Sequence, residues 1–185
     1  TLNMQTATID RSKEWTVADY LQLEESNLPC ELINGELFMS PAPNPHHQRI
    51  LRRLFRFLDR AVNEDEIFIA PIDLFISTKN VFQPDLVYVP NKSFVTNKGI
   101  EGPPEIIIEV ISPSNVYTDR NQKKKSYLAF GVKEYWIVDP ANKTIEIYTP
   151  ESGLDSPLLY LAEEGQISSK VLPHLTFNVS EIFNP

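Results

Sequence analysis

The sequence has a single cysteine, Cys30, among its 185 residues. One cysteine excludes an internal disulfide framework and a cysteine-based zinc site, and it suits a reducing cytoplasm, which we expect as the location. No apolar run approaches the roughly 20 residues that a membrane-spanning helix needs, so we expect no membrane partner. The first fifteen residues are polar and lack the apolar stretch of a secretory signal, which predicts a flexible tail over residues 1–14.

An excess of positive charge is also missing, because the formal net charge is −8 at pH 7. Strong nonspecific binding to nucleic acid normally requires a basic surface. The composition argues against that as a bulk property, but it permits a local basic strip or an acidic site that meets phosphate through metal ions. No repeat or linker divides the chain, which predicts a single domain over residues 15–185.

Hydrophobic patterning predicts a mixed sheet flanked by helices, an α/β or α+β domain. Thr16 and Asp19 have the spacing of a capping box for a helix over 17–26, and Asn34-Gly35 suits a hairpin turn. Further helices are expected over 49–64, after a proline-broken loop, and over 119–130, with Asp119 as N-cap. Strands are expected at 67–70, 72–77, 83–90, 105–111, 134–139, 144–149 and in the C-terminal third, with a terminal helical turn and a loop over 91–103.

Two acidic residues stand out in this pattern. Glu109 interrupts an apolar run, IIIEVI, that is typical of a strand buried on both faces, and a buried carboxylate needs a partner. Asp85 begins another expected strand, where it could equally cap a turn. Together they could share a Mg²⁺ ion, which prefers carboxylate oxygens and also takes waters and phosphate oxygens. Such an ion activates water and stabilises a phosphoryl transition state.

A basic triplet follows the Glu109 strand, on the second predicted helix. With Tyr127 towards the sheet, Lys123 lies one turn before it and Lys124 beside Lys123, so one or both could reach the acidic pair. Lys125 points away. A solvated basic turn is the alternative.

Several segments in order resemble one known family. QPDLVYV, GPPEIIIEVISPSN, the spacing of Asp119, Lys123 and Tyr127, and GVKEYWIVDP are similar to the Uma-two family, which is classed with restriction endonucleases of the PD-(D/E)XK nuclease superfamily. The upstream ELINGELFMSPAPNPHHQRI also fits, so the resemblance covers most of the chain.

The resemblance implies a restriction-endonuclease-like core and a metal-dependent endonuclease that hydrolyses DNA phosphodiester bonds with Mg²⁺ or Mn²⁺. It implies that Asp85, Glu109 and the carbonyl of Val110 hold the metal at an open edge of the sheet and that Lys123 assists the water. The superfamily places its lysine two residues after the glutamate, where this chain has Ile111; the family shares this departure and moves the lysine to the next helix. Cutting both strands of a duplex also implies a homodimer.

Four residues are candidates of second rank: Glu31, Lys124, His47 and Tyr127. Glu31 matches an early acidic residue of the family, although alternation along a hairpin could equally leave it exposed. His47 lies at a loop–helix junction, where a cap or a surface residue is ordinary.

Arg49, Arg53 and Arg56, with Arg60 and the neighbouring Arg52, form a stripe along the first long helix. They could contact a phosphate backbone, or they could be a solvated face that pairs with local acids. For the whole protein, two alternatives to a nuclease stay open: an inactive binding or regulatory protein on the same fold, and a purely structural Glu109–lysine salt bridge. No DNA-reading module such as a helix-turn-helix is recognisable, so the sequence does not indicate a recognised DNA site.

Overall fold

The computed structural model describes residues 12–23 and 30–184. In this part of the chain the helices are α1 (Val17–Tyr20), α2 (Pro45–Asp59), α3 (Lys124–Phe130), which follows a π-helical segment (Thr118–Lys123), and α4 (Ser180–Phe183), with 3₁₀ turns at Glu64–Glu66 and Lys92–Phe94. The strands are β1 (Cys30–Ile33), β2 (Glu36–Met39), β3 (Ile67–Ile69), β4 (Leu74–Ser77), β5 (Asn80–Phe82), β6 (Leu86–Tyr88), β7 (Val95–Thr96), β8 (Gly99–Ile100), β9 (Ile106–Val110), β10 (Glu134–Asp139), β11 (Thr144–Tyr148) and β12 (Leu159–Ala162).

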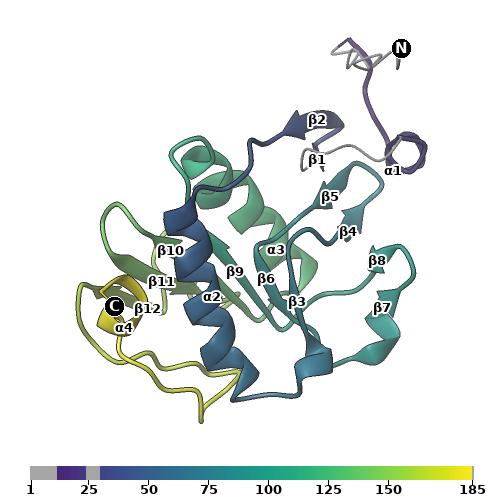
Figure 1. The fold of residues 1–185 in the computed structure, drawn as a ribbon. Coiled ribbons are helices and arrows are strands. Elements are labelled where there is room, and N and C mark those ends of the chain that lie inside the picture. Colours follow the sequence, from purple (N-terminus) through teal and green to yellow (C-terminus); the bar gives the residue numbers. More distant parts are fainter. Residues whose placement is uncertain (1–11, 24–29, 185) are drawn as a thin grey trace, which may run out of the picture.

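The strands form two mixed sheets, so the expected mixed α+β class is confirmed (Figure 1). The first sheet has the order β2-β1-β5-β4-β8-β7, and the second has the order β12-β11-β10-β9-β6-β3. In the second sheet β9 pairs parallel with β10 and antiparallel with β6. The predicted central strand therefore lies inside its sheet, with a neighbour on each side.

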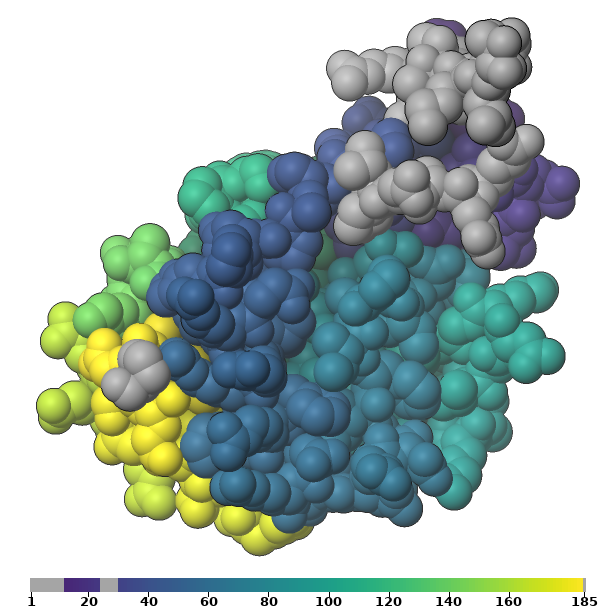
Figure 2. Space-filling view, viewed as in Figure 1, coloured from purple at the N-terminus to yellow at the C-terminus, as the bar shows by residue number. Residues whose placement is uncertain are grey.

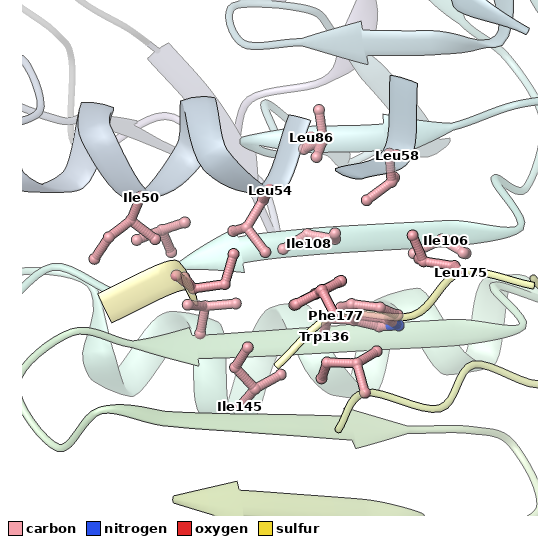
Figure 3. Packing of buried hydrophobic residues seen from close by; sticks show 14 of the residues in the cluster. Ile50, Leu54, Leu58, Leu86, Ile106, Ile108, Trp136, Ile145, Leu175 and Phe177 are labelled. Atoms are coloured by element: carbon pink, nitrogen blue, oxygen red, sulfur yellow. The ribbon is translucent and has the colours of Figure 1, made fainter. Parts of the chain in front are cut away.

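The second sheet is covered on both faces. On one face, Ile50, Leu54 and Leu58 of α2 point towards the sheet and share one buried cluster with Ile108 and Trp136 (Figure 3). The C-terminal segment packs on the same face through the side chains of Leu175 and Phe177, among others. The other face packs against α3 and the first sheet, which together form a second core. Alternation along β9 sends its side chains to these two cores in turn, and Glu109 falls on the α3 side.

Two of the N-terminal predictions, the hairpin turn and the capping box, are confirmed. Asn34 and Gly35 both have positive φ, 52° and 81°, as the tight turn of the β1–β2 hairpin requires. The capping box between Thr16 and Asp19 is present, but α1 ends at Tyr20 and is much shorter than predicted. Residues 1–11 of the predicted tail and residues 24–26 of the predicted helix lie outside the described residues.

Other boundaries differ from the prediction for identifiable reasons. The helix expected from residue 49 begins at Pro45, because Asn44 caps it and proline fits the first helical turn. Asp119 was expected to cap a helix and does not: it lies within the π-helical segment and is buried. β5 was not predicted, and the predicted 91–103 loop contains β7 and β8. One of the strands expected in the C-terminal third is reduced to a single bridge between Gln166 and Asn178. Among the described helices, none is long and apolar enough to cross a membrane.

Candidate functional site

Glu109 lies on β9 and Asp85 lies directly before the neighbouring strand β6, and main-chain amides donate hydrogen bonds to both carboxylates. The antiparallel register of β6 and β9 pairs Leu86 with Ile108, which places Asp85 beside Glu109. The Val110 amide donates to Asp85 Oδ2 at 2.8 Å, and the Asp85 amide donates to Glu109 Oε2 at 3.3 Å. Because β9 is an inner strand, the prediction of an open sheet edge is wrong; the pair lies where β9 ends and β6 begins.

Lys123 is the cation at this site. Its side chain is only 4% exposed, and its ammonium lies 2.9 Å from Glu31 Oε1, 3.0 Å from Glu109 Oε1 and 3.4 Å from Asp119 Oδ1. A lysine ammonium has three N–H donors, and here it faces three carboxylates. Burial alone would lower the pKa of Lys123, but the charges of Glu109 and Glu31 outweigh burial and raise this pKa well above its ordinary value. Lys123 is therefore protonated at neutral pH.

Glu31 and Tyr127 complete the surroundings of Lys123 and Glu109. Glu31 is buried on β1 and also accepts a hydrogen bond from the Gln83 amide at 2.8 Å. The alternative of an exposed hairpin residue is therefore wrong. The Tyr127 hydroxyl donates to Glu109 Oε1 at 2.9 Å. Both carboxylate oxygens of Glu109 thus accept hydrogen bonds from protein donors.

Lys124 does not reach this site. Its ammonium donates to the Leu154 carbonyl at 2.6 Å and lies 4.2 Å from the centre of the Tyr148 ring. Lys124 is half-buried against β11, away from the acidic residues, while Lys125 is exposed. Of the three consecutive lysines, Lys123 is therefore the one that contacts the acidic residues.

His47 is more closely connected to the site than a cap or surface residue would be. It is the third residue of α2 and is buried, and its Nε2 lies 3.0 Å from Asp85 Oδ2. Burial acts to lower the pKa of His47, but the hydrogen bond and the charge of Asp85 outweigh burial and raise this pKa. Asp85 Oδ2 therefore has two partners, the Val110 amide and the His47 ring.

Asp119 was assigned no site role from the sequence, apart from its place in the Asp-Lys-Tyr spacing. The π-helical turn buries it beside Lys123, and the Tyr135 hydroxyl fixes this turn by donating to the Asp119 carbonyl at 2.9 Å. A π-helical turn inside a helix often marks a functional site. Three carboxylates thus contact one lysine, with Asp85 beside Glu109 as a fourth, and the excess of negative charge suits a cation.

The burial of these neighbouring carboxylates changes their pKa values. Burial raises the pKa of Glu109 well above its ordinary value, even though the charge of Lys123 acts in the opposite direction. Burial likewise raises the pKa of Asp119 to about 6. A divalent cation would therefore have to compete with protons for this cluster at mildly acidic pH.

Replacing Asp119 by asparagine is expected to change the pH dependence of the free energy of unfolding. The folded state keeps a proton on Asp119 up to about pH 6, whereas the unfolded state releases it near the ordinary pKa of 3.8. The contribution of this proton to the free energy of unfolding is fully present below the pKa of Asp119 in the unfolded chain. It is lost as the pH rises from there to about 6. Asparagine does not titrate, so it avoids this loss. As the pH rises from about 4 to 7, the free energy of unfolding of Asp119→Asn should therefore increase relative to that of the wild type by on the order of 2 kcal/mol.

Urea denaturation at several pH values measures this difference. Asp155→Asn, at an exposed aspartate, is the matched control and should stay parallel to the wild type. A difference between Asp119→Asn and the wild type that is the same at every pH would contradict the expected shift.

The acidic cluster borders a cavity of about 460 Å³. Its walls include Asp85, Glu109, Asp119 and Lys123, with the loop before α2 on one side and the loop after β9 on the other. The Asp85 side chain is 18% exposed, whereas those of Glu109 and Asp119 are nearly closed off. Of these three carboxylates, Asp85 is thus the one most accessible from the cavity.

The carboxylates at the cavity suit a metal ion that also takes ligands from water and substrate. Within residues 12–23 and 30–184, no group of three or more His, Cys, Asp or Glu side chains is arranged to hold a metal ion. Mg²⁺ does not need such a group, since it keeps several waters and usually takes one or two carboxylates together with phosphate oxygens. Asp85 and Glu109 supply two carboxylates, and Val110 also lines the cavity. These ligands therefore suit a Mg²⁺ ion that is also coordinated by water and substrate phosphate better than an ion coordinated by protein side chains alone.

The candidate arginines separate into two groups. Arg53 Nη1 donates to the Ile182 carbonyl at 2.6 Å and so links α2 to α4. Arg49 and Arg56 are exposed, as are Arg52 and Arg60. Of the three arginines proposed from the sequence, two therefore remain available to a ligand.

Comparisons with known proteins agree with this fold. The Uma2 family model, whose description reads "Putative restriction endonuclease", matches residues 17–180. A crystal structure from Anabaena variabilis, described as "a putative nuclease belonging to DUF820", is similar over 91% of this chain and 97% of its own, with a TM-score of 0.74 and 18% identity. At this identity the likeness shows a shared fold. The comparison with curated proteins finds no match.

Proposed function

The chain belongs to the Uma2 family, and from this premise we propose that it is a metal-dependent endonuclease that hydrolyses phosphodiester bonds in DNA. The family description and that of the Anabaena variabilis neighbour both support a nuclease function. The observation that carries the proposal is the pairing of Asp85 with Glu109 on adjacent strands beside the cavity. Two carboxylates fixed in this way, with a buried lysine beside them, suit phosphoryl chemistry.

Asp85, Glu109 and the carbonyl of Val110 are the groups that would hold Mg²⁺ or Mn²⁺. When bound, such an ion lowers the pKa of a coordinated water and neutralises charge on the phosphate. The chain's own contribution is to fix the carboxylates. The Val110 amide and the His47 ring both hold Asp85 Oδ2, whereas no donor among the described residues holds the other oxygen, which could take a ligand.

Lys123 acts in this proposal as a cation and not as a base. Three carboxylates surround its ammonium, and its raised pKa keeps it protonated at neutral pH. A protonated lysine can orient a water or stabilise the charge that develops on a phosphate oxygen. A homodimer, with one site for each strand of a duplex, follows from the same proposal.

Cleavage of plasmid DNA tests the function. We expect the wild type to nick or cut the plasmid with Mg²⁺ or Mn²⁺ and not with EDTA. Asp85→Asn and Glu109→Gln should lower the rate at least about 10²–10³-fold, the loss typical of removing one group that stabilises the transition state. Glu105→Gln is the matched control, because Glu105 lies just before the same strand but pairs with Lys133 at the surface. A wild type that neither cleaves DNA nor binds metal by calorimetry, even with DNA present, would refute the proposal.

An inactive binding or regulatory protein on the same fold is the second candidate. It is favoured by Glu109, whose two oxygens already accept hydrogen bonds from Lys123, Tyr127 and the Asp85 amide. Calorimetry separates the two: DNA binding without cleavage and without metal uptake would favour this second candidate.

A further inference from the structure

The outer face of α2 carries four exposed arginines, Arg49, Arg52, Arg56 and Arg60 at its C-cap. Among the residues that the structure describes, none of the four takes part in an ion pair. Arg120, by contrast, pairs with Asp139 and Glu146. The alternative of a solvated face therefore agrees with the exposure of these side chains, but the pairing with local acids is not seen in the described part of the chain. We call these four side chains the basic face of α2.

An unpaired basic face is unexpected in this protein. The chain has 25 acidic against 17 basic residues, so acidic partners are plentiful. Like charges three or four residues apart on a helix repel each other and weaken it slightly. The sequence nevertheless places arginines at such spacings, which indicates that an anionic partner from outside the chain offsets the repulsion.

The basic face has the shape of a track. At 100° per residue its four positions fall within an arc of about 80°, and they span roughly 16 Å along the helix. That length is about the rise of five nucleotides along one strand of a duplex. The helix crosses the front of the molecule, where its blue surface is open to solvent (Figure 2).

The track begins at the cavity. His47, Gln48 and Leu51, in the first two turns of α2, line the cavity that contains Asp85 and Glu109. Arg49 lies between them in sequence, and the other three arginines follow along the same helix. A polyanion lying on this face would therefore have one end near the N-terminus of α2, which borders the cavity.

We propose that the basic face of α2 binds the phosphate backbone of duplex DNA and directs it to the cavity. This inference rests on the proposed nuclease function and adds the surface that binds the substrate. Guanidinium groups suit the role, because they donate two parallel hydrogen bonds to a phosphate. Arg53 is not part of the track, since its guanidinium donates to the Ile182 carbonyl.

The chemistry of the face favours nucleic acid over a membrane. A helix that binds a lipid surface needs an exposed apolar side next to its basic side. The apolar side of α2 is buried against the second sheet (Figure 3), and none of the large exposed apolar side chains belongs to this helix. A charge-only contact of this kind suits a phosphate backbone.

Binding of a fluorescein-labelled 20-base-pair duplex, followed by anisotropy over a range of salt concentrations, tests the inference. Every protein carries Asp85→Asn, so that the DNA stays intact. Arg52→Glu combined with Arg56→Glu should weaken binding at least tenfold and reduce the salt dependence by about two phosphate contacts. Lys92→Glu combined with Lys98→Glu, at two exposed lysines near the β7–β8 hairpin, should leave binding within about twofold.

The outcomes separate this inference from the proposed function. Equal binding by the α2 variant and its parent, or no duplex binding by the parent, overturns the inference whether or not the wild type cleaves plasmid. Loss of binding to phosphatidylserine vesicles with unchanged DNA binding also overturns it. Loss of duplex binding by the α2 variant, with binding kept by the lysine variant, supports the inference even if no metal yields cleavage. The absence of cleavage would count against the nuclease proposal only.

Discussion

Replacing Lys123 by methionine is expected to lower the free energy of unfolding by about 3–5 kcal/mol at pH 7, the range found when one partner of a buried ion pair is removed. Lys123 lies within 3.4 Å of Glu31, Glu109 and Asp119, and all four side chains are buried. Without the ammonium, three carboxylates face one another in a poorly solvated space. They must then take up protons, admit water or move apart.

The pH dependence distinguishes this cause from a loss of packing. Protonation of the carboxylates removes their repulsion, so the deficit of Lys123→Met should shrink on going from pH 7 to pH 5. Urea denaturation at both pH values measures the deficit. Lys125→Met, at an exposed position on the same helix, should stay within about 0.5 kcal/mol of the wild type. A deficit that is equal at both pH values would show that the side chain matters for its volume and not its charge.

Replacing Glu134 by alanine is expected to lower the free energy of unfolding by about 3–5 kcal/mol, because each buried donor left without a partner costs roughly 1–3 kcal/mol. The acidic cluster should be unaffected. Glu134 is fully buried on β10. Its carboxylate accepts hydrogen bonds from Trp136 Nε1 at 2.9 Å, from the Ser169 hydroxyl at 2.9 Å and from the amides of Lys170 and Val171 at 2.6 and 3.2 Å. These bonds attach the C-terminal segment to the second sheet.

Thermal unfolding and tryptophan fluorescence measure this effect. Loss of the Glu134 acceptor exposes the Trp136 ring nitrogen to water, so its emission should shift to longer wavelength. Glu164→Ala, at an exposed glutamate of the same C-terminal segment, is the control and should change neither property. Metal binding by Glu134→Ala should equal that of the wild type, and a loss of metal binding would contradict a purely structural role.

The two buried glutamates illustrate how surroundings decide what a side chain does. Glu109 borders a cavity and shares its lysine with two other acids. Glu134 accepts from four neutral donors and does not line that cavity. The same residue type, buried on neighbouring strands, is thus part of a charged site in one case and a structural anchor in the other.

Local patterns in the sequence predicted the elements that depend on local interactions. Asn34-Gly35 predicted the hairpin turn because few other residues adopt positive φ, and the isoleucines before Glu109 predicted a strand buried on both faces. The start of α2 was misplaced because Asn44 and Pro45 were assigned to a loop, although both suit a helix N-terminus. The short strands β5, β7 and β8 are held by neighbouring strands and not by their own patterns, so the sequence did not reveal them.

By itself the sequence determined the mixed α+β class and the family, and it pointed to Asp85 and Glu109 with a lysine of the next helix, since an apolar strand with one acid demands a cation and that helix offers three lysines. Only the tertiary structure decided which lysine that is, because helix rotation sends Lys123 inward and Lys124 to the surface. It also brought Glu31, His47 and Asp119 to the site from three separate elements. Contacts between residues far apart in the chain depend on how sheets and helices pack, and no local pattern encodes that packing.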